Sequence, residues 1–391
     1  MVQAIHQAVA SHKERILQLA QEFVRIKSVT GTEERMAKAV EKSMKELSFD
    51  DVHIDRTGNV IGCVGNGEKS ILFDSHMDTV DVIDAEDWTY PPLDGAIAGG
   101  RLYGRGAVDM KGALAVSIHA AAIARDLGLL EGKRLIIAGS VMEEDYDGVA
   151  VHKMLLENGL HPDYAVFGEA TNMQICRGHN GRALIELTVY GKAAHGSKPE
   201  TGINPVYRLQ TVVRRIEDLA AEISARQGDR GSLALTNIHC VTASNNSVPQ
   251  SASIILDRRL CISEDLHTVE REMERILVGV EGTWRICDTL GTSWTGEPVL
   301  LHANLPAWEI SEEHVLVRAA QSACKAVLGT ESPCVKLGYT TDAIATAGML
   351  GIPSIVLGPG DSANAHGKDE FCPVDELIRA CEIYVHLCDR L

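Results

Sequence analysis

Four short apolar runs in this chain each lead to imidazole or carboxylate side chains, and this pattern limits the folds that the chain can adopt. The runs are residues 71–73 before His76 and Asp78, 135–137 before Glu143 and Glu144, 164–167 before Glu169, and 355–357 before His366. Bounded runs of this kind are typical of buried strands. Because the carboxyl ends of neighbouring strands meet at one crevice of an open α/β sheet, we expect these distant residues to lie together.

The order of helical and strand patterns predicts an α/β protein with two domains. Strand patterns at 60–64 and 71–74 follow two helical segments, and residues 111–127 form a helix of small residues that suits burial. This alternation predicts a doubly wound mixed sheet. From residue 181 the pattern changes to strand, helix, two strands, helix and strand, which predicts an inserted ferredoxin-like α+β unit. We therefore predict one discontinuous domain over residues 1–180 and 293–391 and a second over 181–292.

Charge and composition narrow the range of partners. A formal net charge of −17 argues against nucleic acid as a partner, since affinity for phosphates depends on Lys and Arg. No apolar stretch approaches the length of a membrane span, and the first residues carry no secretory signal pattern, so we expect a cytoplasmic protein without membrane contact. The ten cysteines include no CxxC pair, which argues against a disulfide framework or a structural zinc site.

His76 and Asp78 lie two residues apart on an extended segment, so their side chains face the same way. The Asp78 carboxylate could then accept a hydrogen bond from one ring nitrogen of His76 while the other nitrogen binds a metal. By itself such a pair is more often a surface ion pair. The other candidate residues make the metal interpretation the stronger one.

Asp109 lies in a glycine-flanked turn that contains Gly104, Gly106 and Gly112. A carboxylate has two oxygens and can bridge two cations, and glycines let the backbone approach a ligand closely. The alternative is a dinucleotide-binding turn, but Asp109 takes the place of its third glycine. A negative charge there repels a pyrophosphate, and residues 101–103 make a poor apolar strand, so the dinucleotide interpretation is disfavoured.

Glu143 and Glu144 follow the strand predicted at 135–137 and can divide two tasks between them. One carboxylate can bind a metal while the other takes a proton from water and passes it to a leaving nitrogen. The alternative is an acidic surface turn, because Asp145 and Asp147 are close by. The pair alone favours that alternative.

Taken together, the candidate residues form the ligand set of a two-metal site. Each of two ions would receive one imidazole and one terminal carboxylate, and Asp109 would be shared. The set is His76, Asp109, Glu144, Glu169 and His366. Imidazole and carboxylate ligands suit zinc, and they also accept cobalt or manganese.

At this level of detail the sequence resembles the dinuclear zinc amidohydrolases that include acetylornithine deacetylase, succinyl-diaminopimelate desuccinylase, aminoacylase and glutamate carboxypeptidase. The resemblance spans nearly the whole chain and rests on five motifs in order: SHMDTVDV, GRGAVDMKG, MEED, FGEAT and AHGKDE. It implies that His76 and Glu169 bind one zinc ion, that Glu144 and His366 bind the other, and that Asp109 bridges them. It also implies that Glu143 is the general base and that Asp78 supports His76. Glu169 in place of an aspartate resembles the deacylase and carboxypeptidase branch, and the early segment is similar to a hydrolase branch linked to selenium metabolism.

The resemblance further implies that the inserted unit is a lid and dimerisation domain. His195, in the loop GKAAHGSKP, matches the family histidine that reaches the partner subunit's active site and polarises the scissile carbonyl. Asn246 and Arg259 resemble lid residues that hold a substrate carboxylate or the oxyanion. Ser247 and Gln250 depart from the family pattern, and Arg258 beside Arg259 leaves the carboxylate-binding residue ambiguous.

We therefore expect a metal-dependent homodimeric hydrolase that cleaves the amide bond of a small N-acyl amino acid or a short peptide. Two alternatives remain at this stage. A non-catalytic relative could use the same cleft to bind a small ligand, and a nicotinamide-dependent dehydrogenase is disfavoured by the broken glycine pattern.

Overall fold

The computed structural model describes all 391 residues, and its largest sheet carries the predicted strands at its centre. The order is β1-β2-β6-β3-β7-β20-β8-β18, with β19 beside β8. The strands β6, β3, β7 and β20 are parallel to one another, whereas β1, β2 and β18 pair antiparallel, so the sheet is mixed as predicted. The bounds are β1 (Asp51–Ile54), β2 (Val60–Val64), β3 (Lys69–His76), β6 (Lys133–Ser140), β7 (Tyr164–Phe167), β8 (Ile175–His179), β18 (Trp308–Glu309), β19 (Cys334–Leu337) and β20 (Ser354–Val356).

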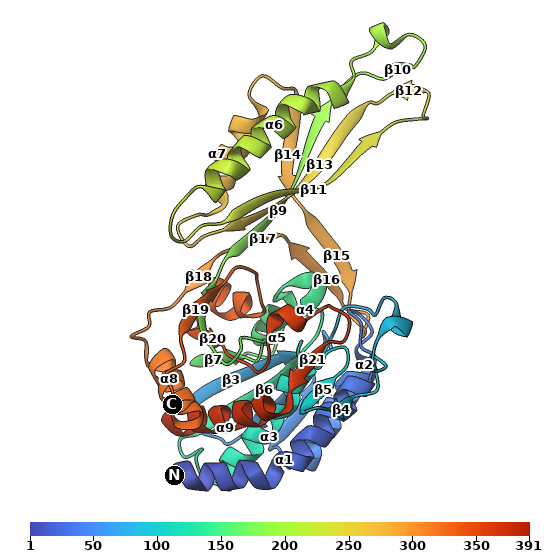
Figure 1. Cartoon of the computed structure of the whole chain (residues 1–391). Helices are drawn as coiled ribbons and strands as arrows, with labels where there is room; N and C mark the ends of the chain where they lie inside the picture. The colour runs from blue at the N-terminus through green and yellow to red at the C-terminus, as the bar shows by residue number, and fades with distance from the viewer.

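Helices cover this sheet, and we call the sheet and its helices the large body. In Figure 1, α1, α3 and α9 lie together on one side of it, and α1 packs against both of the others. Fourteen of the 16 residues of α3 are buried, because its many alanines let neighbouring layers approach closely. The bounds are α1 (Val2–Arg25), α2 (Glu34–Glu46), α3 (Lys111–Asp126), α4 (Glu143–Tyr146), α5 (Val149–Glu157), α8 (Val315–Leu328) and α9 (Val374–Arg390). The large body also contains a small sheet of β4 (Ala96–Ala98), β5 (Arg101–Tyr103) and β21 (Phe371–Pro373).

A second sheet has the order β11-β13-β9-β14, with β17 beside β9, and all of its pairings are antiparallel. Two helices pack against it, and the chain runs strand, helix, two strands, helix and strand, which is the predicted ferredoxin-like order. We call this unit the small body (Figure 1). Its elements are β9 (Gly181–Tyr190), α6 (Pro205–Ser224), β11 (Ser232–Val241), β13 (Ser251–Leu260), α7 (Leu266–Leu277), β14 (Gly282–Ile286) and β17 (Asn304–Leu305).

The far end of the small body, which we call the tip, carries the short pair β10 (Ala194–His195) and β12 (Ser247–Val248) (Figure 1). At the opposite end the chain passes between the sheets twice. It leaves β8 at His179 and enters β9 at Gly181, and it returns between β17 and β18. The domain boundaries at residues 181 and 292 stay a prediction.

A two-stranded ribbon that the sequence did not reveal lies next to this connection. It consists of β15 (Asp288–Thr292) and β16 (Pro298–His302). Its turn is fastened to the large body, because Trp294 Nε1 donates to the carbonyl of Gly58 at 3.2 Å and Thr295 Oγ1 donates to the carbonyl of Arg56 at 2.7 Å. None of the helices in the structure combines the length and the apolar character needed to cross a membrane.

Candidate metal centre

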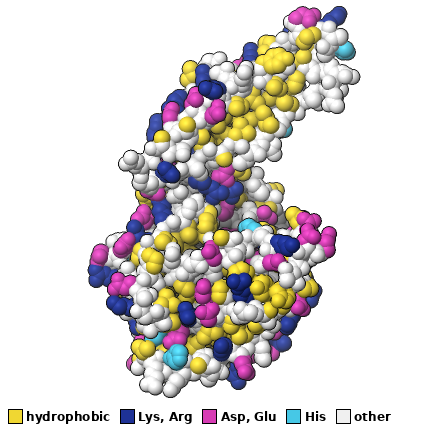
Figure 2. Space-filling model, in the orientation of Figure 1, with side chains coloured by type: hydrophobic (Ala, Val, Ile, Leu, Met, Phe, Trp, Pro, Cys, Tyr) yellow, Lys and Arg dark blue, Asp and Glu magenta, His cyan; other side chains and the backbone are white.

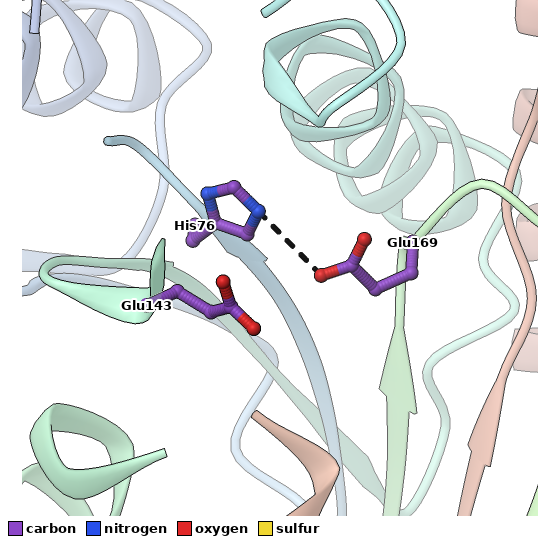
Figure 3. Close-up of side chains that lie close together, drawn as sticks. All are labelled: His76, Glu143 and Glu169. Atoms are coloured by element: carbon purple, nitrogen blue, oxygen red, sulfur yellow. Dashed lines mark ion pairs between the residues drawn. The ribbon is translucent and has the colours of Figure 1, made fainter. Parts of the chain in front are cut away.

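The candidate metal ligands converge at the carboxyl ends of the central parallel strands. His76 is the last residue of β3, Glu169 follows β7, and Glu143 and Glu144 begin α4 soon after β6. Figure 3 shows the side chains of His76, Glu143 and Glu169 pointing toward one another from these three segments. Asp109 precedes α3, and His366 lies in the loop after β20. The sheet topology therefore brings together residues from five separate parts of the chain.

The Asp109 carboxylate lies between two imidazoles. Its Oδ1 is 2.9 Å from Nε2 of His76, and its Oδ2 is 3.1 Å from Nε2 of His366. Each imidazole has one further carboxylate: Glu169 Oε1 is 3.5 Å from His76 Nε2, and Glu144 Oε2 is 3.0 Å from His366 Nε2. The five side chains thus form two groups that share Asp109.

These distances fit divalent ions. Ligand atoms that bind one tetrahedral ion at about 2.0–2.1 Å lie about 3.3–3.4 Å from one another. Two groups of side chains, one of His76, Glu143 and Glu169 and one of His76, Asp109 and Glu144, each place their ligand atoms within 4.8 Å of one another. Nitrogen and oxygen ligands at such spacing suit zinc and similar metals.

The buried carboxylates of the cluster bring several negative charges together, and positive charge stabilises them. Although burial opposes protonation of His76, its bonds to Asp109 and Glu169 raise its pKa well above the ordinary value. The Asp109 carboxylate raises the pKa of His366 to about 10, with Glu144 adding to the effect. Burial raises the pKa of Glu143 and that of Glu169. The carboxylates therefore hold protons on the imidazoles at positions where metal binding would displace them.

Asp78 supports the site differently from the sequence prediction. Nδ1 of His76 lies 3.0 Å from the backbone carbonyl of Asp78, whereas the nearer carboxylate oxygen is 3.7 Å away. Because a carbonyl can only accept, Nδ1 carries the proton and Nε2 is left free for a metal. The prediction that the Asp78 carboxylate orients the ring was therefore wrong about the accepting atom.

The buried carboxylate of Asp78 instead holds the first turn of α4. It accepts hydrogen bonds from the backbone N–H groups of Glu143, at 3.0 Å, and Glu144, at 3.2 Å, and from the hydroxyl of Thr30 at 2.8 Å. A negative charge is favourable at this position, because the first N–H groups of a helix have no partner within it. Asp78 thereby fixes the backbone that carries both glutamates.

A buried ion pair supports the other side of the cluster and was missed from the sequence. Arg105 Nη1 is 2.6 Å from Glu370 Oε2, and Glu370 Oε1 accepts from the backbone N–H groups of Val108 and Asp109. Arg105 Nη2 donates to the carbonyl of His366 at 3.1 Å. The pair therefore ties the turn of Asp109 to the loop of His366. Its two residues lie inside the motifs GRGAVDMKG and AHGKDE, but only their proximity in the fold reveals the link.

A cavity of ≈ 440 Å³ opens over the cluster and reaches the small body. Its volume suits a small ligand. The wall away from the candidate metal ligands contains Arg259, the predicted substrate-binding residue, and also Arg182, Asp147 and Tyr339, which the sequence did not single out. Arg258 is fully buried on the other face of β13 and pairs with Glu264 and Glu272, so only Arg259 of the two neighbouring arginines lines the cavity.

His195 and Asn246 lie away from this cavity in the same chain. His195 is on β10 and Asn246 adjoins β12, so both belong to the tip, the part of the small body farthest from the large body (Figure 1). They line a separate hollow with residues such as Ser197 and Pro249. Nδ1 of the exposed His195 accepts from the backbone N–H of Ser197 at 3.1 Å, and its Nε2 has no hydrogen-bond partner. Within one chain the structure does not bring these two residues to the candidate metal ligands.

Comparison with known proteins places this chain beside metal-dependent hydrolases. The family model for peptidase family M20/M25/M40 matches residues 72–390. The uncharacterized protein YgeY of Escherichia coli K12 is 29% identical over 367 residues, which cover 93% of this chain and 91% of that protein. Acetylornithine deacetylase of Aliivibrio salmonicida is 26% identical over 323 residues, which cover 80% of this chain and 79% of that protein.

Solved structures of this type share the fold. The M20 family metallo-carboxypeptidase Sso-CP2 from Sulfolobus solfataricus superposes with a TM-score of 0.75 at 19% identity, covering 96% of this chain and 98% of that one. YXEP of Bacillus subtilis, described as a dinuclear metal-binding M20 peptidase, gives a TM-score of 0.67 at 14% identity, covering 97% and 98%.

Proposed function

The chain belongs to peptidase family M20/M25/M40, and from this premise we propose that it is a dinuclear metallohydrolase that cleaves the amide bond of an N-acyl amino acid or a short peptide. The observation that carries the proposal is the Asp109 carboxylate, which faces one imidazole with each oxygen while each imidazole has a further carboxylate of its own. Such a set offers each of two cations one imidazole, one terminal carboxylate and one oxygen of the shared carboxylate.

In this proposal His76 and Glu169 hold one ion, Glu144 and His366 hold the other, and Asp109 bridges them. Zinc is the metal that we propose, and cobalt or manganese would fit the same ligands. When bound, two such ions supply Lewis acidity, which activates water and polarises an amide carbonyl. The remaining steps belong to side chains of this chain.

Glu143 moves the proton in this scheme. Its carboxylate takes a proton from the attacking water and delivers it to the leaving amine nitrogen. Its position beside His76 and Glu169 supports this role, because a base must lie within hydrogen-bond reach of the attacking water. Asp78 acts as a positioning residue by holding the backbone of Glu143.

We also propose that residues 181–292 act as lid and dimerisation domain and that the protein is a homodimer. The small body exposes many apolar side chains, and Figure 2 shows hydrophobic surface along much of its visible face. The exposed apolar side chains of the small body include Tyr190, Ile203, Val206, Tyr207, Ile238 and Val241. Exposed apolar area of this kind is typical of an interface. His195 and Asn246 would then reach the cavity of the partner chain, where His195 stabilises the oxyanion.

Three further expectations belong to the same proposal. The ten cysteines are all free thiols, which supports a reducing, cytoplasmic location. The non-catalytic alternative is disfavoured because the five candidate ligands and Glu143 as a base lie in one cluster within a single chain. Peptide or N-acyl amino acid substrates fit a cavity of this size.

The experiment is a hydrolysis screen on chelated protein that is reloaded with zinc, cobalt or manganese. The substrates are N-acetyl, N-succinyl and N-formyl amino acids and dipeptides, and the readout is free amine. We expect release that depends on the metal and disappears in the Glu143→Gln variant. Equal rates with and without metal, or full activity of that variant, would contradict the proposal.

A further inference from the structure

The segment that carries Glu143 and Glu144 has a backbone that needs support from outside. Its helix α4 is a single turn, and a helix of one turn is not stable by itself. Left-handed residues lie on both sides of the helix, Met142 with φ 63° before it and Asp147 with φ 32° after it. Residues other than glycine rarely adopt this conformation, and it persists only where the surrounding structure enforces it. The position of both glutamates therefore depends on contacts with the rest of the chain.

Asp342 contacts this segment at both of its ends. Its Oδ2 lies 2.9 Å from the hydroxyl oxygen of Ser140, the last residue of β6, and its Oδ1 accepts from the backbone N–H of Gly148 at 2.7 Å. Ser140 precedes the left-handed Met142, and Gly148 follows the left-handed Asp147. One carboxylate thus joins the end of β6 to the start of α5 and encloses the strained turn between them.

The other supports of the segment each hold a part of it. Asp78 accepts from the first N–H groups of α4, as described above, and Glu33 Oε1 accepts from the backbone N–H of Met142 at 3.2 Å. Thr340 Oγ1 donates to Oδ1 of Asp147 at 2.5 Å. Only the Asp342 side chain reaches both ends of residues 140–148.

The burial of Asp342 is unfavourable unless the residue has a role. Asp342 is 3% exposed, and no Lys, Arg or His forms an ion pair with it. A buried carboxylate without a cationic partner costs free energy. Asp342 is also absent from the wall of the cavity, so it does not touch a ligand bound there. Its two hydrogen bonds to residues 140–148 are therefore the contacts that explain its presence.

We propose that Asp342 is a positioning residue that holds residues 140–148 in the conformation in which Glu143 reaches the attacking water and Glu144 reaches its metal ion. This inference rests on the proposed hydrolase function and adds a residue that contacts neither metal nor substrate. Precise support matters at such a site, because a displacement of about 1 Å can lower the rate by about 10²-fold.

A merely stabilising role for Asp342 makes a different prediction. Its loss would then lower the stability of the whole fold and leave the geometry of the folded protein unchanged. Loss of a positioning residue acts locally, on the backbone of residues 140–148 and on the metal ion that Glu144 binds. Amide hydrogen exchange resolves local from global opening and requires neither metal nor substrate.

The test combines hydrogen exchange of the metal-free protein with calorimetric titration by zinc. In Asp342→Ala the amides of residues 141–148 should exchange at least about tenfold faster, while those of α9 keep their protection. One of the two zinc ions should bind about ten- to hundredfold more weakly, as expected when support for a ligand is lost. A parallel titration of His366→Ala identifies that ion, because His366 is the other terminal ligand proposed for it.

Asp342→Asn is the conservative variant. The hydroxyl of Ser140 also lies 3.0 Å from Oδ2 of Asp74, and its one hydrogen serves only one of the two carboxylates. The amide of Asp342→Asn keeps an acceptor for Gly148 and offers a donor to Ser140, so slow exchange and tight zinc binding should be retained. Ser140→Ala removes one of the two contacts and should change both readouts in the same direction by a smaller factor. This variant decides the question where Asp342→Ala does not fold.

Thr346→Val is the control for loss of a buried polar group nearby. The Thr346 hydroxyl bonds to Ser354 at 2.7 Å and to the carbonyl of Ala343, and not to residues 140–148, so its loss should leave the exchange of that segment and both zinc affinities unchanged. Unchanged exchange in Asp342→Ala and Ser140→Ala, equal effects in Thr346→Val, or an Asp342→Asn protein as impaired as Asp342→Ala would overturn the proposal. Faster exchange confined to the segment, in a protein that binds no zinc and hydrolyses nothing, would uphold the support by Asp342 and refute the proposed function.

Discussion

The position of His195 allows a strict test of the proposed dimer. In one chain this exposed residue lies at the tip, far from the candidate ligands, and its Nε2 has no hydrogen-bond partner. If His195 takes part in catalysis, it must act on the active site of another copy. The perturbation combines two chains with different defects, one carrying His195→Ala and the other Glu143→Gln.

The expected magnitudes follow from this arrangement. Loss of one donor to an oxyanion costs about 10²- to 10³-fold in kcat. Loss of a general base costs about 10²- to 10⁴-fold, so each homodimeric variant should be nearly inactive. In a heterodimer of the two variants, one site combines the intact Glu143 of one chain with the intact His195 of the other, while the second site has both defects. The heterodimer should therefore recover about half of the wild-type kcat per dimer.

The assay uses co-expression with two different affinity tags, tandem purification of the heterodimer and steady-state kinetics with the best substrate from the screen. His267→Ala is the matched control, because His267 is exposed on α7 of the small body, outside both the cavity and the tip hollow, and should keep full activity. A heterodimer no more active than the average of the two parent homodimers would refute action between chains. Near-normal kcat in the His195→Ala homodimer would remove the residue from the mechanism.

The other predictions concern Glu143, Asp109 and the buried arginine. Glu143→Gln should keep both ions, measured by elemental analysis, while kcat falls by about 10²- to 10⁴-fold; loss of metal would instead make Glu143 a ligand. Asp109→Ala should lose both ions, because each histidine loses the carboxylate oxygen that faces it, and full metal occupancy would argue against a bridge. Arg258→Gln should lower the free energy of unfolding by about 3–5 kcal/mol in denaturant titrations, because Glu272 is left buried without its ion-pair partner and Glu264 keeps only Arg226. Burial alone would raise the pKa of Glu264, but Arg258, the backbone N–H of Cys261 and Arg226 together lower it to about 2. The stability that this group contributes is therefore present above about pH 4.5 and is lost as the pH falls toward 2, and the variant should lack the part of this acid sensitivity that Arg258 supplies.

The fold and the convergence of the candidate ligands could be predicted because both depend on local patterns. The apolar runs that end near His76 and Glu169 are enough to predict two buried strands. The topology of α/β sheets then brings the ends of these strands together. The small body could also be predicted from local patterns, because buried and partly buried residues alternate along nearly all of β9 and along β13 from Ile254 onward.

What could not be predicted depends on contacts between distant segments. The ribbon of β15 and β16 contains Gly291 and Pro298, which weaken strand patterns, and it is stabilised where Trp294 meets Gly58. The acceptor for His76 proved to be a backbone carbonyl, which every residue offers and no sequence motif marks. Arg105 and Glu370 lie far apart in sequence and become partners only when β5 pairs with β21.

Arg258 and Arg259 show most clearly how strand geometry assigns function. The two residues are chemically identical neighbours, but successive side chains of a strand point to opposite faces. One therefore lies under α7 with every donor satisfied, and the other lies in the cavity with a free nitrogen opposite Arg182. A shift of the register by one residue would exchange these roles and place the structural arginine at the cavity. Arg258→Gln should accordingly lower stability, whereas Arg259→Gln should raise KM for acids and leave the unfolding transition nearly unchanged.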